Sequence, residues 1–203
     1  AHPHTLSSLN SLAELLRRTG KLKEAERLQR MAVRIKEEKL GALHPDTLTS
    51  KHNLAVVLNK MGTLRKAEHL FYNVLDGRRQ SLGPDHPDTV DSMASLAICL
   101  HHRRKLPEAE AWFRKALATK REKPGDERLV ILYYMTSLAS LLKDLHQYDE
   151  ADKVCRTALA SLRRRFGKDH PYAARASRVL RQISIQRVFP CSSYQILFVA
   201  AGL

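Results

Sequence analysis

An internal period of 42 residues constrains this chain more than any other feature of its sequence. The dipeptide His-Pro stands at His2-Pro3, His44-Pro45 and His86-Pro87, and it returns two periods later at His170-Pro171. At the position between the last two, Arg128-Leu129, the dipeptide is absent. Self-similarity at a fixed period is the signature of repeat architectures, in which each unit packs against its neighbours. The chain is therefore expected to be an array of similar units.

Leucine, alanine and glycine columns keep the same 42-residue register. The columns are Leu12, Leu54, Leu96, Leu138 and Leu180; Leu16, Leu58, Leu100 and Leu142; Ala13, Ala55, Ala97 and Ala139; Ala25, Ala67, Ala109 and Ala151; and Gly41, Gly83, Gly125 and Gly167. We interpret the leucines as core positions and the alanines as positions where helices approach closely. A buried leucine contributes roughly 1.5–3 kcal/mol by its transfer from water.

Each unit is predicted to contain two helices. The apolar residues of the segment from Leu9 to Leu16 have the i, i+3, i+4, i+7 spacing of one helical stripe, and a second stripe runs from Leu22 to Ile35. Gly20 lies between the stripes and suits a left-handed residue that ends the first helix. Pro45 suits the first turn of the next helix, and Asp46 favours its positive end. Each repeat is therefore helix, turn, helix, loop.

The predicted domain is a repeat array over residues 1–187. Its units are residues 1–42, 43–84, 85–126 and 127–168, followed by the first helix of a fifth unit at residues 169–187. Residues 188–203 form an apolar tail outside the pattern, which is too short to span a bilayer because a span needs about 20 apolar residues. We expect this tail to cap the last helix or to be disordered.

The charge of the chain indicates acidic partners without naming their class. There are 35 Lys and Arg against 21 Asp and Glu, for a formal net charge of +14. Such a charge attracts acidic peptides, nucleic acids and anionic lipids alike. The three cysteines, Cys99, Cys155 and Cys191, are far apart and odd in number, which is typical of free thiols in a reducing compartment. The expected location is the cytoplasm.

No pattern in the sequence predicts catalysis, and neither a metal nor a cofactor is expected. The sequence contains no His-Glu-x-x-His, no glycine-rich phosphate loop and no Gly-x-Ser-x-Gly. The His-Pro histidines stand one to a repeat and are too dispersed to bind one ion together. Cys99 and Cys155 lie among apolar residues of predicted helices, which favours small buried hydrophobes over nucleophiles. We expect the protein not to be an enzyme.

The columns Leu12-Ala13, Gly20, Glu24-Ala25-Glu26, Leu40-Gly41 and His44-Pro45 resemble the 42-residue tetratricopeptide repeats of kinesin light chain. The resemblance covers about residues 1 to 185. It implies an all-α fold, an α-solenoid in which antiparallel helix hairpins form a right-handed superhelix. In that family the concave face is lined by the first helix of each repeat and holds an extended peptide of a cargo or partner. Related arrays also occur in proteins that carry a nucleotide-binding switch domain.

The register of this resemblance implies a set of groove residues that is rich in cations and nearly free of acids. Asn53 matches one of two adjacent asparagines that can hydrogen-bond a peptide backbone in the family. A cationic groove suits an acidic ligand, because Arg grips carboxylates in a bidentate manner. The implied set is Asn10, Arg17, Arg18, His52, Asn53, Asn59, Lys60, His101, His102, Thr136, Lys143, Arg175 and Arg178.

The predicted function is a protein-protein interaction scaffold that binds an extended, acidic peptide of a partner or cargo. If the chain is a true light chain, the partner is a motor heavy chain or its cargo. Two alternatives remain open: a charge-driven nucleic-acid-binding helical repeat, and the sensor region of a nucleotide-binding switch protein. The basic runs His101 to Lys105 and Arg163 to Arg165 are the motifs for nucleic acid, but we interpret them as solvated helix ends.

Overall fold

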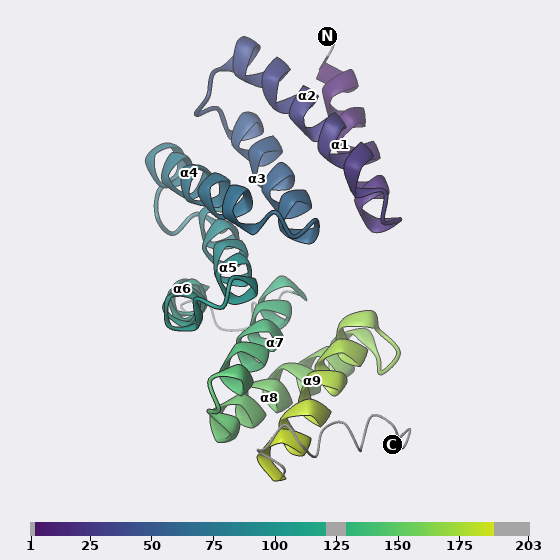
Figure 1. Ribbon diagram of the computed structural model, residues 1–203, viewed down its shortest axis with the longest axis vertical. Coiled ribbons are helices and arrows are strands. Elements are labelled where there is room, and N and C mark those ends of the chain that lie inside the picture. The colour runs from purple at the N-terminus through teal and green to yellow at the C-terminus, as the bar shows by residue number, and fades with distance from the viewer. Residues whose placement is uncertain (1–2, 121–128, 189–203) are drawn as a thin grey trace. The chain divides into compact units, whose positions relative to one another are not determined.

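The computed structural model describes residues 3–120 and 129–188, and within these ranges the regular elements are all α-helices (Figure 1). The all-α prediction is therefore confirmed. The helices are α1 (Pro3–Arg18), α2 (Leu22–Leu40), α3 (Pro45–Lys60), α4 (Leu64–Leu82), α5 (Pro87–His102), α6 (Leu106–Lys120), α7 (Leu129–Asp144), α8 (Tyr148–Phe166) and α9 (Pro171–Val188). The predicted tail lies outside the described residues except for Val188, which ends α9.

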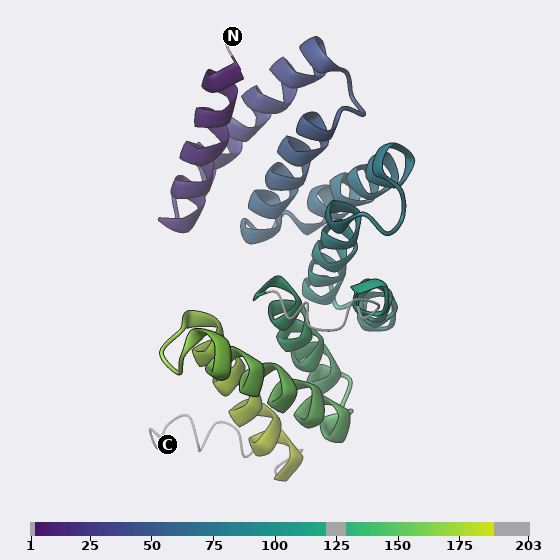
Figure 2. The ribbon, with the colours of Figure 1, turned by 180° about the vertical axis from the view of Figure 1, so that it is seen from behind.

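The helices belong to two compact units, Ala1–Thr119 and Lys120–Leu203. In the first unit each helix from α1 to α4 packs on the next one (Figures 1 and 2). The first helices of the hairpins also touch, α1 with α3 and α3 with α5. In the second unit α8 packs on α7 and α9, and α7 touches α9. Within each unit, the first helices of successive hairpins therefore lie side by side.

The His-Pro dipeptides begin helices, as the sequence predicts. Pro45 and Pro87 are the first residues of α3 and α5, and an aspartate follows each of them in the first turn. The structure adds a role for the histidine, because Nδ1 of His44 accepts a hydrogen bond from the backbone amide of Asp46 at 3.2 Å. His86 and His170 cap α5 and α9 in the same way. Each dipeptide thus supplies an N-cap acceptor and a proline with a helical φ.

The turn inside each hairpin requires one left-handed residue. Gly20 has φ of +83° and Gly62 has φ of +78°, so the prediction made for Gly20 is confirmed. The equivalent positions in the next two hairpins are Arg104 and His146, with φ of 63° and 62°. The left-handed turn therefore persists in hairpins that have a side chain at this position.

The substitution Gly62→Ala should isolate the cost of this left-handed conformation. A Cβ built at Gly62 meets no atom within 4 Å, so the expected loss comes from the backbone alone. We expect the free energy of unfolding to fall by about 1–2 kcal/mol. Urea denaturation followed by circular dichroism measures the difference. An unchanged midpoint would mean that the turn relaxes into another conformation.

The leucine and alanine columns form the core between the helices. Leu54, Leu96 and Leu138 are buried, and so are all members of the two alanine columns that lie in the described residues. Two members of the first leucine column are not buried, because 47% of the surface of Leu12 is exposed and Leu180 is half-buried. Leu12 lies on α1, which has described neighbours on one side only, so the prediction that every leucine of this column is a core residue is wrong at Leu12.

Candidate functional site

The first helices of the first unit are joined by hydrogen bonds between polar side chains. Several of these side chains belong to the predicted groove set, and in each pair one partner lies about one repeat away from the other. The pairs are Ser50 to Asn10 at 3.4 Å, His52 with Ser95 at 3.5 Å, and His102 with Asn59 at 3.0 Å. These pairs link α1 to α3 and α3 to α5, and we call the side of the unit that these three helices form the first-helix face.

Cations gather at the C-terminal ends of α1 and α3. The guanidinium of Arg17 donates to the carboxylate of Glu14 at 2.6 Å. The pKa of Glu14 is lowered, first by this hydrogen bond and, against the opposing effect of burial, by the positive charges of Arg17, Arg18 and Lys60. Arg18 and Lys60 are exposed, and within the described residues neither has an ion-pair partner. The charges of three cations thus act on one carboxylate, which leaves this end of the face positive.

A cavity of about 190 Å³ that is open to solvent lies where α1, α2 and α3 meet. Two of its lining residues carry buried polar atoms without a hydrogen-bond partner in the described part of the chain, Oε1 of Gln29 and Nδ1 of His52. Burial, and next the charge of Arg78, lowers the pKa of His52 to about 3, so its ring is neutral at physiological pH. The cavity is lined by Ala13, Glu14, Arg17, Gln29, His52, Asn53, Val56 and Val57.

The structure brings Arg17, His52 and Asn53 of the predicted set together in this cavity, whereas His101 and His102 stack on each other at the end of α5. In the second unit, taken by itself, Thr136 is 1% exposed and donates to the carbonyl of Leu132, so it offers no group to a surface ligand.

The other predicted residues of the second unit lie at its surface. Lys143 pairs with Asp144 at 3.2 Å, and Arg178 is exposed. Arg175 lies 4.5 Å from the ring centre of Tyr133 and donates to Ser137 at 3.3 Å. Arg175 thus links α9 to α7, as the polar pairs of the first unit link their helices.

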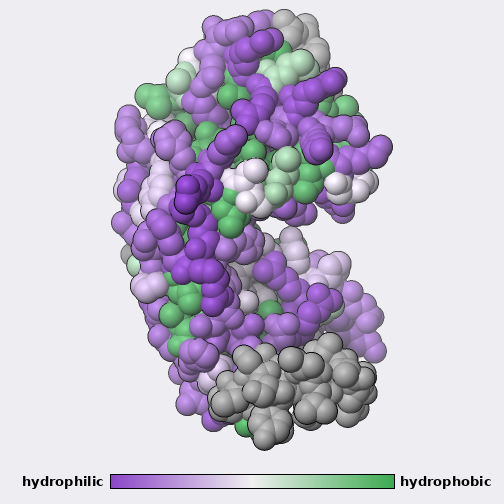
Figure 3. Space-filling view, viewed as in Figure 1, coloured by the Kyte–Doolittle hydropathy of each residue, from purple (hydrophilic) through white to green (hydrophobic). Residues whose placement is uncertain are grey.

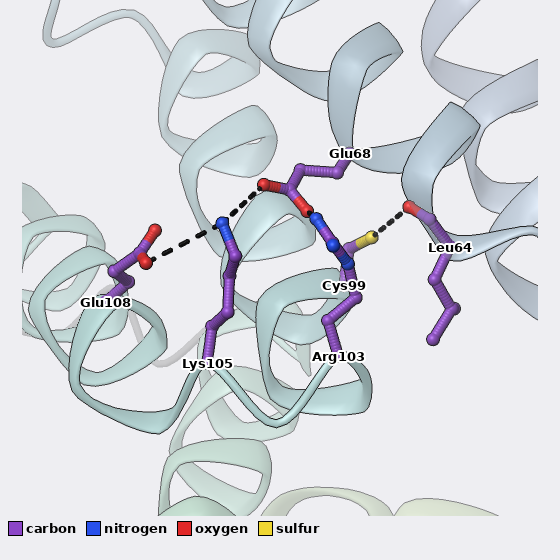
Figure 4. A network of polar contacts seen from close by, with 6 residues as sticks. All are labelled: Leu64, Glu68, Cys99, Arg103, Lys105 and Glu108. Atoms are coloured by element: carbon purple, nitrogen blue, oxygen red, sulfur yellow. Dashed lines mark hydrogen bonds and ion pairs between the residues drawn. The ribbon is translucent and has the colours of Figure 1, made fainter.

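The basic run from His101 to Lys105 is partly used inside the fold. Glu68 of α4 is 7% exposed and forms ion pairs with both Arg103 and Lys105, as Figure 4 shows. Lys105 also lies 3.6 Å from Glu108. These contacts hold the turn between α5 and α6 against α4, which argues against this run as a nucleic-acid surface. Sequence reasoning missed Glu68, although Glu26, Glu110 and Asp152 occupy the same register.

Two buried cations were also missed. Nζ of Lys36 donates to the carbonyl of Asp46 at 3.2 Å and to Ser50 at 2.9 Å. Arg78 repeats this contact one period later, with Asp88 and Ser92, both at 2.8 Å. In the second unit the equivalent pair is Leu162 and Ala176, which are both buried and apolar. The signal in the sequence was a cation followed by a serine 14 residues later in two repeats, Lys36 with Ser50 and Arg78 with Ser92.

The remaining reactive side chains show no sign of a catalytic or metal centre in the described ranges. Within residues 3–120 and 129–188, no group of three His, Cys, Asp or Glu residues could hold a metal ion. Burial raises the pKa of Cys99 and of Cys155 to about 11, which keeps both as thiols, while Cys191 lies outside the described residues.

The described helices fall short of the combined length and hydrophobicity that a membrane span requires. On the side shown in Figure 3, the surface over the first unit is mostly hydrophilic.

Comparison with solved structures supports a solenoid fold. A kinesin light chain candidate from Podosopora anserina with nearly identical TPR-like repeats is 23% identical, with 99% of this chain and 95% of that chain covered and a TM-score of 0.76. BtubC (BKLC) from P. vanneervenii is 18% identical, with coverages of 82% and 66% and a TM-score of 0.69. A Rap protein complexed with Competence and Sporulation Factor is 16% identical, with coverages of 91% and 53% and a TM-score of 0.73.

Family models give the assignment. A search of curated proteins found no match. Two models, each described as a tetratricopeptide repeat, match the chain, one over residues 46–122 and the other over residues 5–46 and 131–172. Together they account for most of the sequence, and their matched segments follow the helix hairpins of both units. The predicted resemblance and the α-solenoid fold class are thereby confirmed, and the chain belongs to the tetratricopeptide repeat family.

Proposed function

We propose that this protein is an interaction scaffold that binds an extended, acidic peptide segment of a partner across the first-helix face of α1, α3 and α5. The observation that carries the proposal is the ion pair of Arg17 with Glu14 next to the exposed side chains of Arg18 and Lys60, whose charges act on the same carboxylate. A carboxylate of a bound peptide would join Glu14 among these cations and balance the excess positive charge. Hydrogen bonds between charged groups are among the stronger polar contacts available to such a surface.

The rest of the first-helix face supports an extended ligand. Asn53 and His101 are half-buried on α3 and α5, and Asn59 is joined to His102, so polar groups continue beyond the cationic end. Groups spaced along several helices suit a segment that contacts one repeat after another. The same proposal includes a cytoplasmic location, and a motor heavy chain or its cargo as the partner if the chain acts as a light chain.

The double charge reversal Arg18→Glu, Lys60→Glu should weaken binding of an acidic, Trp-containing peptide by about five- to ten-fold, since it replaces attraction by repulsion at two exposed positions. Glu14→Gln should strengthen binding, because it removes the carboxylate that competes for the same cations. A fluorescence-anisotropy titration with the labelled peptide measures both effects.

The matched control is Arg27→Glu, Arg34→Glu, which makes the same change in net charge at two exposed positions of α2. It should leave the affinity near that of the wild type. If both double variants lose affinity equally, the attraction comes from net charge and no peptide face is needed. Displacement of the peptide by a nonspecific DNA duplex, together with a steep fall of affinity with salt, would instead support the nucleic-acid alternative.

A further inference from the structure

Two aromatic residues that break the repeat pattern meet on the second helices of the first unit. Tyr72 of α4 and Trp112 of α6 lie edge to face, with 6.5 Å between their ring centroids. Tyr72 is 37% exposed, and Trp112 is half-buried. In the other second helices the column of Tyr72 holds Arg30, Arg114 and Arg156, and the column of Trp112 holds Leu28, Leu70 and Val154. Two independent departures from the repeat therefore coincide in space.

The tyrosine replaces a residue that forms an ion pair within its own helix. In α2, α6 and α8 the arginine of this column pairs with the acid four residues before it, Arg30 with Glu26, Arg114 with Glu110 and Arg156 with Asp152. In α4 the acid of this register is Glu68, which pairs instead with cations of the turn between α5 and α6. Tyr72 thus presents an aromatic ring to solvent where the other second helices have a solvated ion pair.

Two cations lie beside the indole of Trp112. The guanidinium carbon of Arg79 is 5.3 Å from the ring centroid, and Nζ of Lys115 is 5.6 Å from it. Lys115 is exposed and Arg79 is half-buried, and within residues 3–120 and 129–188 neither has a carboxylate partner. Contact with an aromatic ring does not neutralise a cation, so both keep the capacity to bind a carboxylate.

We propose that Tyr72, Arg79, Trp112 and Lys115 form a second interaction surface, the second-helix patch, which binds an acidic segment of a partner protein. Carboxylates of the segment pair with Arg79 and Lys115, and an apolar side chain of the same segment covers the exposed ring of Tyr72. Tryptophan, tyrosine and arginine are the residues that most often dominate the binding energy of protein interfaces. The patch belongs to second helices, so this partner is separate from the peptide of the first-helix face.

The fluorescence of Trp112 reports on this patch without a label, because the sequence contains one tryptophan. Three Trp-free peptides are titrated into the full chain: Glu-Glu-Leu-Glu-Leu-Glu-Glu, the same peptide with alanine in place of leucine, and the same peptide with lysine in place of glutamate. We expect a saturable change in emission with the first peptide, at an affinity about five-fold above the alanine peptide. The lysine peptide should give no change.

Two sets of variants locate the binding. Arg79→Glu, Lys115→Glu should weaken the response to the first peptide by about five- to ten-fold. The matched control is Arg18→Glu, Lys60→Glu, which makes the same change in net charge on the first helices and should leave the response of Trp112 near that of the wild type. Tyr72→Arg restores the residue of the other second helices, so it should fold normally and bind the leucine and alanine peptides about equally.

Equal losses in the two double variants would overturn the proposal, because net charge alone would then explain the attraction. An unresponsive Trp112 in the wild type would also overturn it. So would vesicles of phosphatidylcholine and phosphatidylserine that change the emission where the acidic peptide does not, since the patch would then contact a membrane surface. None of these results alters the anisotropy titration of the first-helix face, so the two proposals fail separately.

Discussion

The substitution Leu96→Ala should lower the free energy of unfolding by about 2–5 kcal/mol, whereas Leu12→Ala should lower it by less than about 1 kcal/mol. The two leucines occupy the same position of the repeat, and the chemical change is identical. They differ in burial, because Leu96 is 0% exposed between the helices of two hairpins and Leu12 is 47% exposed. The truncation at Leu96 leaves a cavity in a packed core, and the truncation at Leu12 removes atoms that already contact water.

Urea denaturation of the two variants and the wild type, followed by far-ultraviolet circular dichroism, measures both losses. Leu54→Ala serves as a second buried example, since Leu54 has 5% exposure in the same column. It should behave like Leu96→Ala. Equal losses at Leu12 and Leu96 would contradict the burial of this column by neighbouring hairpins, because only stacking distinguishes the two sites.

Much of the fold was predictable because each position is sampled several times by the repeat. The period placed Pro45 and Pro87 at helix starts and Gly20 in a left-handed turn, and the structure has both features. The exposure of Leu12 was not predictable in this way. A column shows which face of a helix is apolar, but only the arrangement in space shows whether a neighbour covers that face.

The candidate site was predictable only in outline. The register placed Arg17 and Lys60 on first helices, but the implied groove set omitted Glu14, which lies among the cations and shapes their field. The cavity at Gln29 was also missed, because a repeat pattern displays only the residues that recur. The informative residue was the one that breaks its column, since Gln29 is a buried polar residue in a register that holds Phe71 and Phe113.

Acid should destabilise this protein through His52. The pKa of an unperturbed histidine is about 6.5, and burial together with the charge of Arg78 lowers that of His52 to about 3. Between these two values the unfolded chain binds a proton that the folded chain does not. The stabilising effect of a neutral His52 is therefore complete above about pH 6.5 and is lost as the pH falls toward 3.

The expected size of this effect is about 3 kcal/mol between pH 7 and pH 4. The variant His52→Asn isolates it, because asparagine does not titrate and Asn10 already occupies the equivalent position of the first repeat. All other ionisable groups are the same in the two proteins, so their contributions cancel in the difference. Denaturation at pH 7, 6, 5 and 4 measures the free energy of unfolding of both proteins. The value for the wild type, relative to that for His52→Asn, should fall by about this amount between pH 7 and pH 4.

A second variant separates titration from hydrogen bonding. Ser95→Ala removes the hydroxyl that lies 3.5 Å from Nε2 of His52 but keeps the imidazole between α3, α4 and the cavity. This variant should have a lower free energy of unfolding at every pH, and it should still lose stability in acid as the wild type does. If the gap between wild type and His52→Asn is the same at pH 7 and pH 4, the ring of His52 accepts a proton within the folded chain.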